Sequence, residues 1–166
     1  MSVVIEPISL AHVVSYREAV DVVAREKQYL AAIEAWPLAD TERFVRSNLE
    51  RGVAQFVALI EERVIGWADI VPHDVHAMAH RGSLGIGVLP EYRGRGVGRQ
   101  LLRACIERAL KSGLTRIELE VRVDNLRAIA LYESVGFVRE GVKLRGMRID
   151  GEYFDTLMMG YLEPST

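Results

Sequence analysis

The stretch that decides the fold is LGIGVLPEYRGRGVGRQLLRACIERAL, residues 84–110. It opens as an apolar strand and closes as a helix with one apolar face. Between the two, residues 93–99 hold three glycines and three arginines. Glycine weakens both helices and strands, so packing alone does not account for this segment, which we call the glycine–arginine loop.

The helix after this loop is predicted to begin without a cap. Apolar residues at four-residue spacing and a closing Gly113 indicate a helix over 97–111. No Ser, Thr, Asp or Asn precedes it, so its first N–H groups and its dipole are free to bind an anion. Glycines at 94, 96 and 98 let the anion approach the backbone, and the arginines add positive charge. The pattern predicts a pyrophosphate site.

Two other glycine-rich phosphate loops fit poorly. A Walker A loop needs a Lys-Ser or Lys-Thr ending, which is lacking here. The dinucleotide pattern G-x-G-x-x-G fails at its last position, which is Arg99. Glu118 and Glu120 lie about where a ribose-binding acid is expected, but the sequence contains only one strand–helix–strand unit.

The rest of the chain predicts a mixture of hairpins and helices. Ser9 is expected to begin a helix that runs to about Lys27, and Asp40 to cap a second helix that ends at Gly52. The other predicted elements are strands at 3–5, 55–60, 64–71, 83–89 and 116–121, a helix at 126–134, and two final strands joined by the turn Asp150-Gly151.

Composition excludes several classes of protein. The 166 residues suit one domain, 1–166, and 49% hydrophobic residues with 27% charged ones are typical of a soluble globular protein. A net charge of −2 argues against a nucleic-acid partner. The lone Cys105 lies in an apolar helical pattern and predicts a buried residue in a reducing compartment. Without an apparent signal peptide or a long apolar run, we expect a cytoplasmic protein with no membrane partner.

Two motifs resemble one family. The run R93-G-R-G-V-G98 resembles the Q/R-x-x-G-x-G/A signature of the GNAT superfamily of N-acetyltransferases, and N125-LRAIALYESVGF137 resembles its second signature. The likeness extends over residues 54–161. It implies an α/β fold with a mixed, mostly antiparallel sheet of about seven strands, helices on both faces and a splayed pair of parallel strands. It also implies acetyl-CoA as co-substrate, no metal, and direct transfer to a primary amine in a ternary complex.

The resemblance also implies which residues hold the cofactor. The pantetheine arm is expected to pair with the strand at Ile86, Gly87 and Val88, where Gly85 and Gly87 fit a bulge or a close approach. Asn125 is expected to contact the same arm, to cap the following helix, or both. The pyrophosphate is expected at Arg93, Gly94, Arg95, Gly96, Val97, Gly98 and Arg99.

Tyr132 is the predicted catalytic acid. Its hydroxyl stays protonated at neutral pH and can donate a proton to the leaving coenzyme A sulfur, although the ring can instead simply pack on its helix. The general base is open among Asp69, His73, Glu120 and a water relay. His73, His76 and His80 match no zinc spacing, so no metal site is predicted.

The acceptor amine is the least determined part of the prediction. It can be an amino acid, a small-molecule amine or a peptide N-terminus. We expect its pocket under residues 29–38 and the loop 72–80, with Tyr29 and Trp36 as walls and Glu26 or Glu34 near a positive charge; ordinary core packing of these residues is the alternative. A non-catalytic acetyl-CoA sensor and a homodimer formed through the C-terminal strands are further hypotheses.

Overall fold

The structure is a computed structural model and describes residues 2–165, so Met1 and Thr166, the ends of the expected domain, lie outside the described residues. Seven strands form one sheet in the order β1-β2-β3-β4-β5-β7-β6. They are β1 (Val4–Pro7), β2 (Ala54–Ile60), β3 (Arg63–Pro72), β4 (Arg81–Val88), β5 (Arg116–Arg122), β6 (Val138–Ile149) and β7 (Glu152–Leu162). The helices are α1 (Val13–Arg25), α2 (Leu38–Arg51), α3 (Val97–Lys111) and α4 (Leu126–Val135), with 3₁₀ turns η1 (Leu10–His12), η2 (His76–Met78) and η3 (Pro90–Tyr92).

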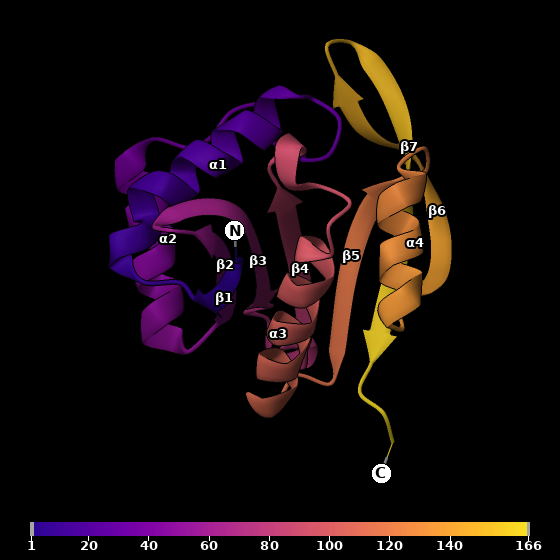
Figure 1. Cartoon of the computed structure of the whole chain (residues 1–166). Coiled ribbons are helices and arrows are strands. Elements are labelled where there is room, and N and C mark those ends of the chain that lie inside the picture. Colours follow the sequence, from indigo (N-terminus) through magenta and orange to yellow (C-terminus); the bar gives the residue numbers. More distant parts are fainter. Residues whose placement is uncertain (1, 166) are drawn as a thin grey trace.

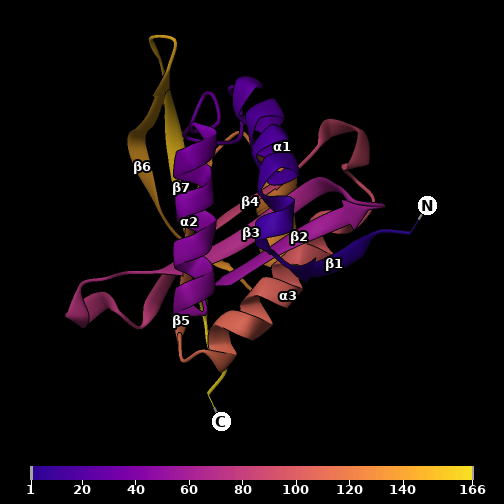
Figure 2. The ribbon, with the colours of Figure 1, turned by 90° about the vertical axis from the view of Figure 1, so that its left-hand side faces the viewer.

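Helices cover both faces of this sheet (Figure 1). Neighbouring residues of β3 point to opposite faces: Trp67 packs edge-on against Tyr16 of α1, while Gly66 faces Leu101 of α3. Figure 2 shows α1 and α2 side by side on the near face of the sheet. The predicted mixed α/β sheet with two helical layers is therefore confirmed. No helix in residues 2–165 is long and apolar enough to cross a membrane.

The parallel pair β4–β5 is splayed, as expected. The two strands pair only from Arg81–Arg116 to Ser83–Glu118. Beyond that point β4 stays paired with β3 up to Val88, and β5 stays paired with β7 up to Arg122. Because each strand is held on its outer side, their inner edges separate and leave backbone N–H and C=O groups facing the gap.

The two N-terminal helices begin differently from the prediction. Ser9 is followed by the 3₁₀ turn η1, and α1 starts only at Val13. Asp40 is not the cap of α2. The helix begins at Leu38 after Pro37, whose φ of −52° suits a helix entry, and Asp40 lies in the first turn, where its carboxylate complements the helix dipole.

The glycines of β4 make room for side chains of β3. The register between β3 and β4 runs without a shift from Gly66–Val88 to Pro72–Gly82, so of the two predicted alternatives, a bulge or a close approach, the bulge is excluded. A Cβ on Gly87 would lie 2.3 Å from the Trp67 ring, and a Cβ on Gly85 would lie 3.2 Å from an Asp69 carboxylate oxygen. The close approach is real, but it comes from Trp67 and Asp69, and it places the Asp69 carboxylate over β4.

Candidate active site

A cleft of about 350 Å³ opens where β4 and β5 separate. Counting Tyr132, which is predicted to act on the cofactor's sulfur, ten of the twelve residues predicted to contact the cofactor line it: Ile86, Gly87, Val88, Arg93, Gly94, Gly96, Gly98, Arg99, Asn125 and Tyr132. The other two lie elsewhere. Val97 is buried in the core, and Arg95 is exposed with its guanidinium 5.8 Å from the centre of the Tyr92 ring.

The glycine–arginine loop and the start of α3 form one wall of this cleft. Gly94 and Gly96 have φ values of 74° and 81°, in the left-handed region that favours glycine. Gly96 is the N-cap of α3, and no side chain caps the helix. The first N–H groups of α3 are therefore available to an anion in the cleft, as the sequence predicted from the lack of a capping residue.

Arg93 holds the loop in place through contacts with the rest of the chain. Its two terminal nitrogens donate to Glu26 at 2.9 and 2.5 Å, and its Nε donates to the carbonyl oxygen of Val88 at 2.9 Å. Its guanidinium also lies 4.6 Å from the centre of the Tyr29 ring. Glu26 raises the pKa of Arg93. The charge of Arg93 is thus balanced by Glu26, and the side chain ties the end of α1 to the loop.

Sequence reasoning missed a third arginine of the cleft. Arg127, in the first turn of α4, lines the cleft, and its guanidinium would touch a Cβ placed on Gly94 at 3.0 Å. Its place two residues after Asn125 in the second motif was the available signal. Asn125 itself caps α4, accepting a hydrogen bond from the Ala128 N–H at 3.3 Å, and also lines the cleft.

Tyr132 lies on the wall of the cleft formed by α4. Its side chain is 8% exposed, and its ring packs against Phe137 with the ring centres 5.8 Å apart. Burial raises the pKa of Tyr132 to about 12. The hydroxyl is therefore protonated at every pH near neutrality and can act as a hydrogen-bond or proton donor.

A second hollow, of about 210 Å³, lies on the α1 side of the sheet. Ile86 of β4 lines both the hollow and the cleft, so the two cavities lie on either side of this residue. Of the residues predicted to form the acceptor pocket, Trp36 and Glu34 line the hollow. Tyr29 and Glu26 instead contact Arg93, and no residue of the loop 72–80 lines the hollow. The full lining is Tyr16, Arg17, Val20, Leu30, Ala32, Glu34, Ala35, Trp36, Thr41, Phe44, Trp67, Asp69, Gly85 and Ile86.

Asp69 is a carboxylate in mainly apolar surroundings. It projects from β3 into the hollow, two residues from Trp67 and directly opposite Gly85 in the sheet. Loss of hydration raises the pKa of Asp69 to about 7. Burial, followed by the negative charge of Asp69, raises the pKa of the neighbouring Tyr16.

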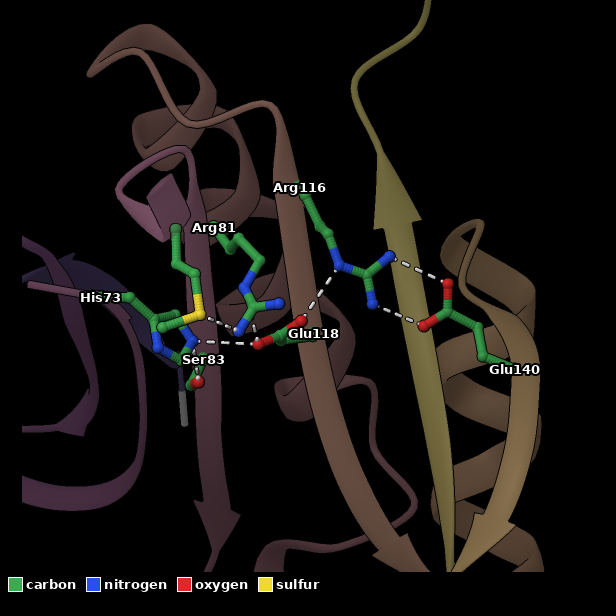
Figure 3. A network of polar contacts seen from close by, with 7 residues as sticks. His73, Arg81, Ser83, Arg116, Glu118 and Glu140 are labelled. Carbon is green, nitrogen blue, oxygen red and sulfur yellow. Dashed lines mark hydrogen bonds and ion pairs between the residues drawn. The ribbon is translucent and has the colours of Figure 1, made fainter. Parts of the chain in front are cut away.

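The other two base candidates have polar partners. Glu120 lines the cleft, where it accepts a hydrogen bond from Thr156 at 2.6 Å and lies 3.3 Å from Lys143. His73 lies outside the cleft, in the polar network of Figure 3. Its Nε2 is 2.9 Å from Glu118 and 3.2 Å from the Ser83 hydroxyl, so one ring nitrogen meets both groups.

This polar network joins the strands at the root of the splay. Arg116 donates to Glu118 at 3.0 Å and to Glu140 at 2.9 and 2.5 Å, which connects β5 with β6 across β7 (Figure 3). His73 and Ser83 join the network from the side of β4. Within residues 2–165, no group of three or more His, Cys, Asp or Glu side chains is placed to hold a metal ion.

The chain is similar to known acetyltransferases. The model of the Acetyltransferase (GNAT) family matches residues 20–137. The N-alpha-acetyltransferase RimI of Mycobacterium tuberculosis is 46% identical over 80 residues, which are 48% of this chain and 49% of that protein. The match therefore spans about half of that relative. The L-amino acid N-acetyltransferase AaaT of Escherichia coli is 36% identical over 109 residues, 65% of this chain and 67% of that protein.

The fold comparison agrees with this relationship. The structure of yncA from Salmonella typhimurium with its cofactor acetyl-CoA has a TM-score of 0.93 and covers 100% of this chain and 96% of that one, at 17% sequence identity. At this identity the likeness concerns the fold alone. Because the family model covers most of the sequence, including both motifs, the chain belongs to the GNAT family of acetyltransferases.

Proposed function

We propose that this chain is one acetyltransferase domain that transfers the acetyl group of acetyl-CoA directly to a primary amine. The observation that carries the proposal is that two cavities share the lining residue Ile86. The cleft extends from the uncapped start of α3 to Tyr132, and the hollow on the other side of Ile86 contains Asp69. A thioester lying at Ile86 would therefore face the cleft on one side and an incoming amine on the other.

Acetyl-CoA fills the cleft in this proposal. The pantetheine arm runs along the open edge of β4 at Ile86 to Val88 and uses the backbone groups left unpaired by the splay. The pyrophosphate lies on the N–H groups of the loop and the first turn of α3, with Arg99 and Arg127 nearby. Arg93 shapes the loop through Glu26 and does not bind phosphate with its side chain.

The reaction follows from these positions. The amine nitrogen attacks the thioester carbon, the new C–N bond forms, and the C–S bond breaks. Tyr132 donates a proton to the departing sulfur, and the amine loses a proton. Cys105 does not act as a nucleophile, because it is buried in α3 with its thiol 3.2 Å from the carbonyl oxygen of Ala68. Transfer is therefore direct, without an acyl-enzyme.

Asp69 is the group we propose to receive the amine proton. Its pKa of about 7 is suited to proton transfer at neutral pH, and its carboxylate lies in the hollow that shares Ile86 with the cleft. Glu120 already accepts a hydrogen bond from Thr156 and lies 3.3 Å from Lys143, so its carboxylate has polar partners within the chain. His73 lines neither cavity.

Replacing Asp69 with asparagine should stabilise the fold while it impairs catalysis. The folded-state pKa of about 7 exceeds the ordinary value of 3.8, so ionising Asp69 destabilises the native chain increasingly from about pH 4 to pH 7. Asp69→Asn removes this cost. We expect the unfolding free energy of the variant to exceed that of the native chain by an amount that grows over this range and reaches roughly 2 kcal/mol at pH 8. The full pKa shift corresponds to ~4 kcal/mol, and partial hydration of the carboxylate reduces it.

Urea unfolding at several pH values measures this effect, and kcat/KM for a good amine should fall at least 10-fold in the same variant. Asp124→Asn is the control, because a hydrogen bond from Arg122 lowers the pKa of Asp124. Ionised Asp124 stabilises the native chain, so this variant should lose unfolding free energy relative to the native chain as the pH rises. An Asp69→Asn chain with native turnover would show that another group or water takes the proton.

The function is tested by following thiol release from acetyl-CoA with a panel of amines. We expect α-amines to react faster than spermidine or Nα-blocked lysine at pH 7, because about 10% of an α-amine with pKa near 8 is neutral, against about 0.04% of a lysine amine. Faster turnover of spermidine would reverse this preference. Tight acetyl-CoA binding without thiol release for any amine would favour the sensor hypothesis.

Two finer statements remain proposals. We propose a cytoplasmic location from the lone, buried Cys105. We also propose a homodimer, because β6 is an edge strand of the sheet and carries the exposed apolar residues Val138, Val142 and Leu144. A single species with the mass of one chain in analytical ultracentrifugation would exclude the dimer.

A further inference from the structure

The hollow beside Ile86 contains an arginine that the proposed chemistry does not use. Arg17 projects from α1 and lines the hollow together with Asp69. Its Nε donates to the carbonyl oxygen of Trp36 at 2.6 Å, which fixes the guanidinium against the segment between α1 and α2. Among residues 2–165, no carboxylate lies within 4.0 Å of this guanidinium, and its two terminal nitrogens make no hydrogen bond.

The acidic groups around Arg17 have their hydrogen bonds and ion pairs elsewhere, and Arg17 acts on Asp21 through its charge alone. Asp21, one turn further along α1, accepts hydrogen bonds from Arg25 at 2.8 Å and from the Ala35 N–H at 2.9 Å. Glu34, also in the lining, lies 3.6 Å from Arg25. A guanidinium held through Nε, with both terminal nitrogens open, is arranged to bind a planar anion such as a carboxylate.

The remaining lining is largely apolar. Tyr16 and Trp67 pack edge-on at 6.1 Å, and Trp36 and Phe44 pack edge-on at 5.7 Å, all four as parts of the wall. At about 210 Å³ the hollow is smaller than typical drug-sized sites. It therefore presents a carboxylate, a guanidinium and an apolar wall to one small molecule, which complements an α-amino acid with an apolar side chain.

We propose that Arg17 binds the carboxylate of a free, apolar α-amino acid, and that such amino acids rather than peptides or polyamines are the acceptors of this chain. The inference rests on the proposed function. The amine then lies toward Asp69 and Ile86, and the side chain lies against the aromatic wall. A peptide N-terminus offers a neutral amide where the carboxylate would be, and a polyamine offers no negative charge to Arg17.

The test compares L-leucine with L-leucinamide, which differ only in the carboxylate. We expect Arg17→Gln to lower the ratio of kcat/KM for leucine over leucinamide by roughly 10- to 100-fold relative to the native chain, through a higher KM for leucine. Using the ratio cancels the different amine pKa values of the two compounds. Arg46→Gln, at an exposed arginine of α2 that pairs with Glu42, is the control and should leave the ratio unchanged.

Binding gives a readout that is independent of turnover. The chain has two tryptophans, Trp36 and Trp67, and both line the hollow, so intrinsic fluorescence in the presence of coenzyme A should report leucine binding. We expect leucine to bind at least 10-fold more weakly to Arg17→Gln than to the native chain. An unchanged leucine to leucinamide ratio, in turnover and in binding, overturns the role of Arg17. Leucine binding without any thiol release overturns the proposed function instead.

Discussion

Replacement of Tyr132 by phenylalanine is expected to lower kcat by roughly 10²-fold or more while the Kd for acetyl-CoA changes less than about threefold. The substitution keeps the ring and its packing on Phe137 and removes only the hydroxyl. Without a proton donor, the C–S bond must break with the sulfur leaving as a thiolate. The loss therefore falls on the transition state and not on binding of the cofactor.

Tyr161→Phe is the matched control. Tyr161 also packs against Phe137, with the two ring centres 5.7 Å apart, but it does not line the cleft. Single-turnover kinetics of thiol release and calorimetry of acetyl-CoA binding measure the two constants. The burial that raises the pKa of Tyr132 to about 12 also predicts no loss of kcat from its ionisation below about pH 10. A Tyr132→Phe chain with most of its turnover would leave this tyrosine only a packing role.

The parts of the fold that the sequence predicted are those determined by local signals. The helix α3 was expected over 97–111 and is found there, because apolar residues repeat at helical spacing between an uncapped start and Gly113. The turn at Asp150 and Gly151 was likewise predicted, because Asp-Gly is a typical sequence for this turn type. Both residues adopt the positive φ that the turn requires. Such helix and turn signals depend only on residues that are close together in the sequence.

The parts that could not be predicted depend on strand register and distant pairing. Arg93 and Glu26 are 67 residues apart in sequence, and no local pattern indicates that the arginine of the first motif would meet that carboxylate. Similarly, Gly85 and Gly87 indicated a close approach, but only the β3–β4 register identifies Asp69 and Trp67 as the side chains that lie over them. From the sequence, Asp69 was one base candidate beside His73, Glu120 and a water relay, and only this register shows that it lies opposite Gly85.

The paired Arg93 also changes what is expected of the cofactor loop. Since its guanidinium is held by Glu26 and the Val88 carbonyl, most of the binding of pyrophosphate should come from backbone N–H groups, whose direction depends on the loop glycines. We therefore expect Gly96→Val to weaken acetyl-CoA binding by roughly 10²-fold. Gly96 has φ 81° and ψ 3°, a conformation that a β-branched residue adopts only with strain, and relaxing that strain turns the first N–H groups of α3 away from the phosphates.

The strain itself also destabilises the fold, so the effect on binding must be separated from it. Gly52 has nearly the same conformation, φ 67° and ψ 27°, and it ends α2 far from the cleft. A Cβ on either glycine meets no atom within 4 Å, so neither position is crowded at Cβ and both share the strain of a positive φ. We expect Gly52→Val and Gly96→Val to lower the unfolding free energy by similar amounts, roughly 1–3 kcal/mol, and only Gly96→Val to lose affinity in calorimetry. Equal affinities in the two variants would mean that the pyrophosphate does not lie on this loop.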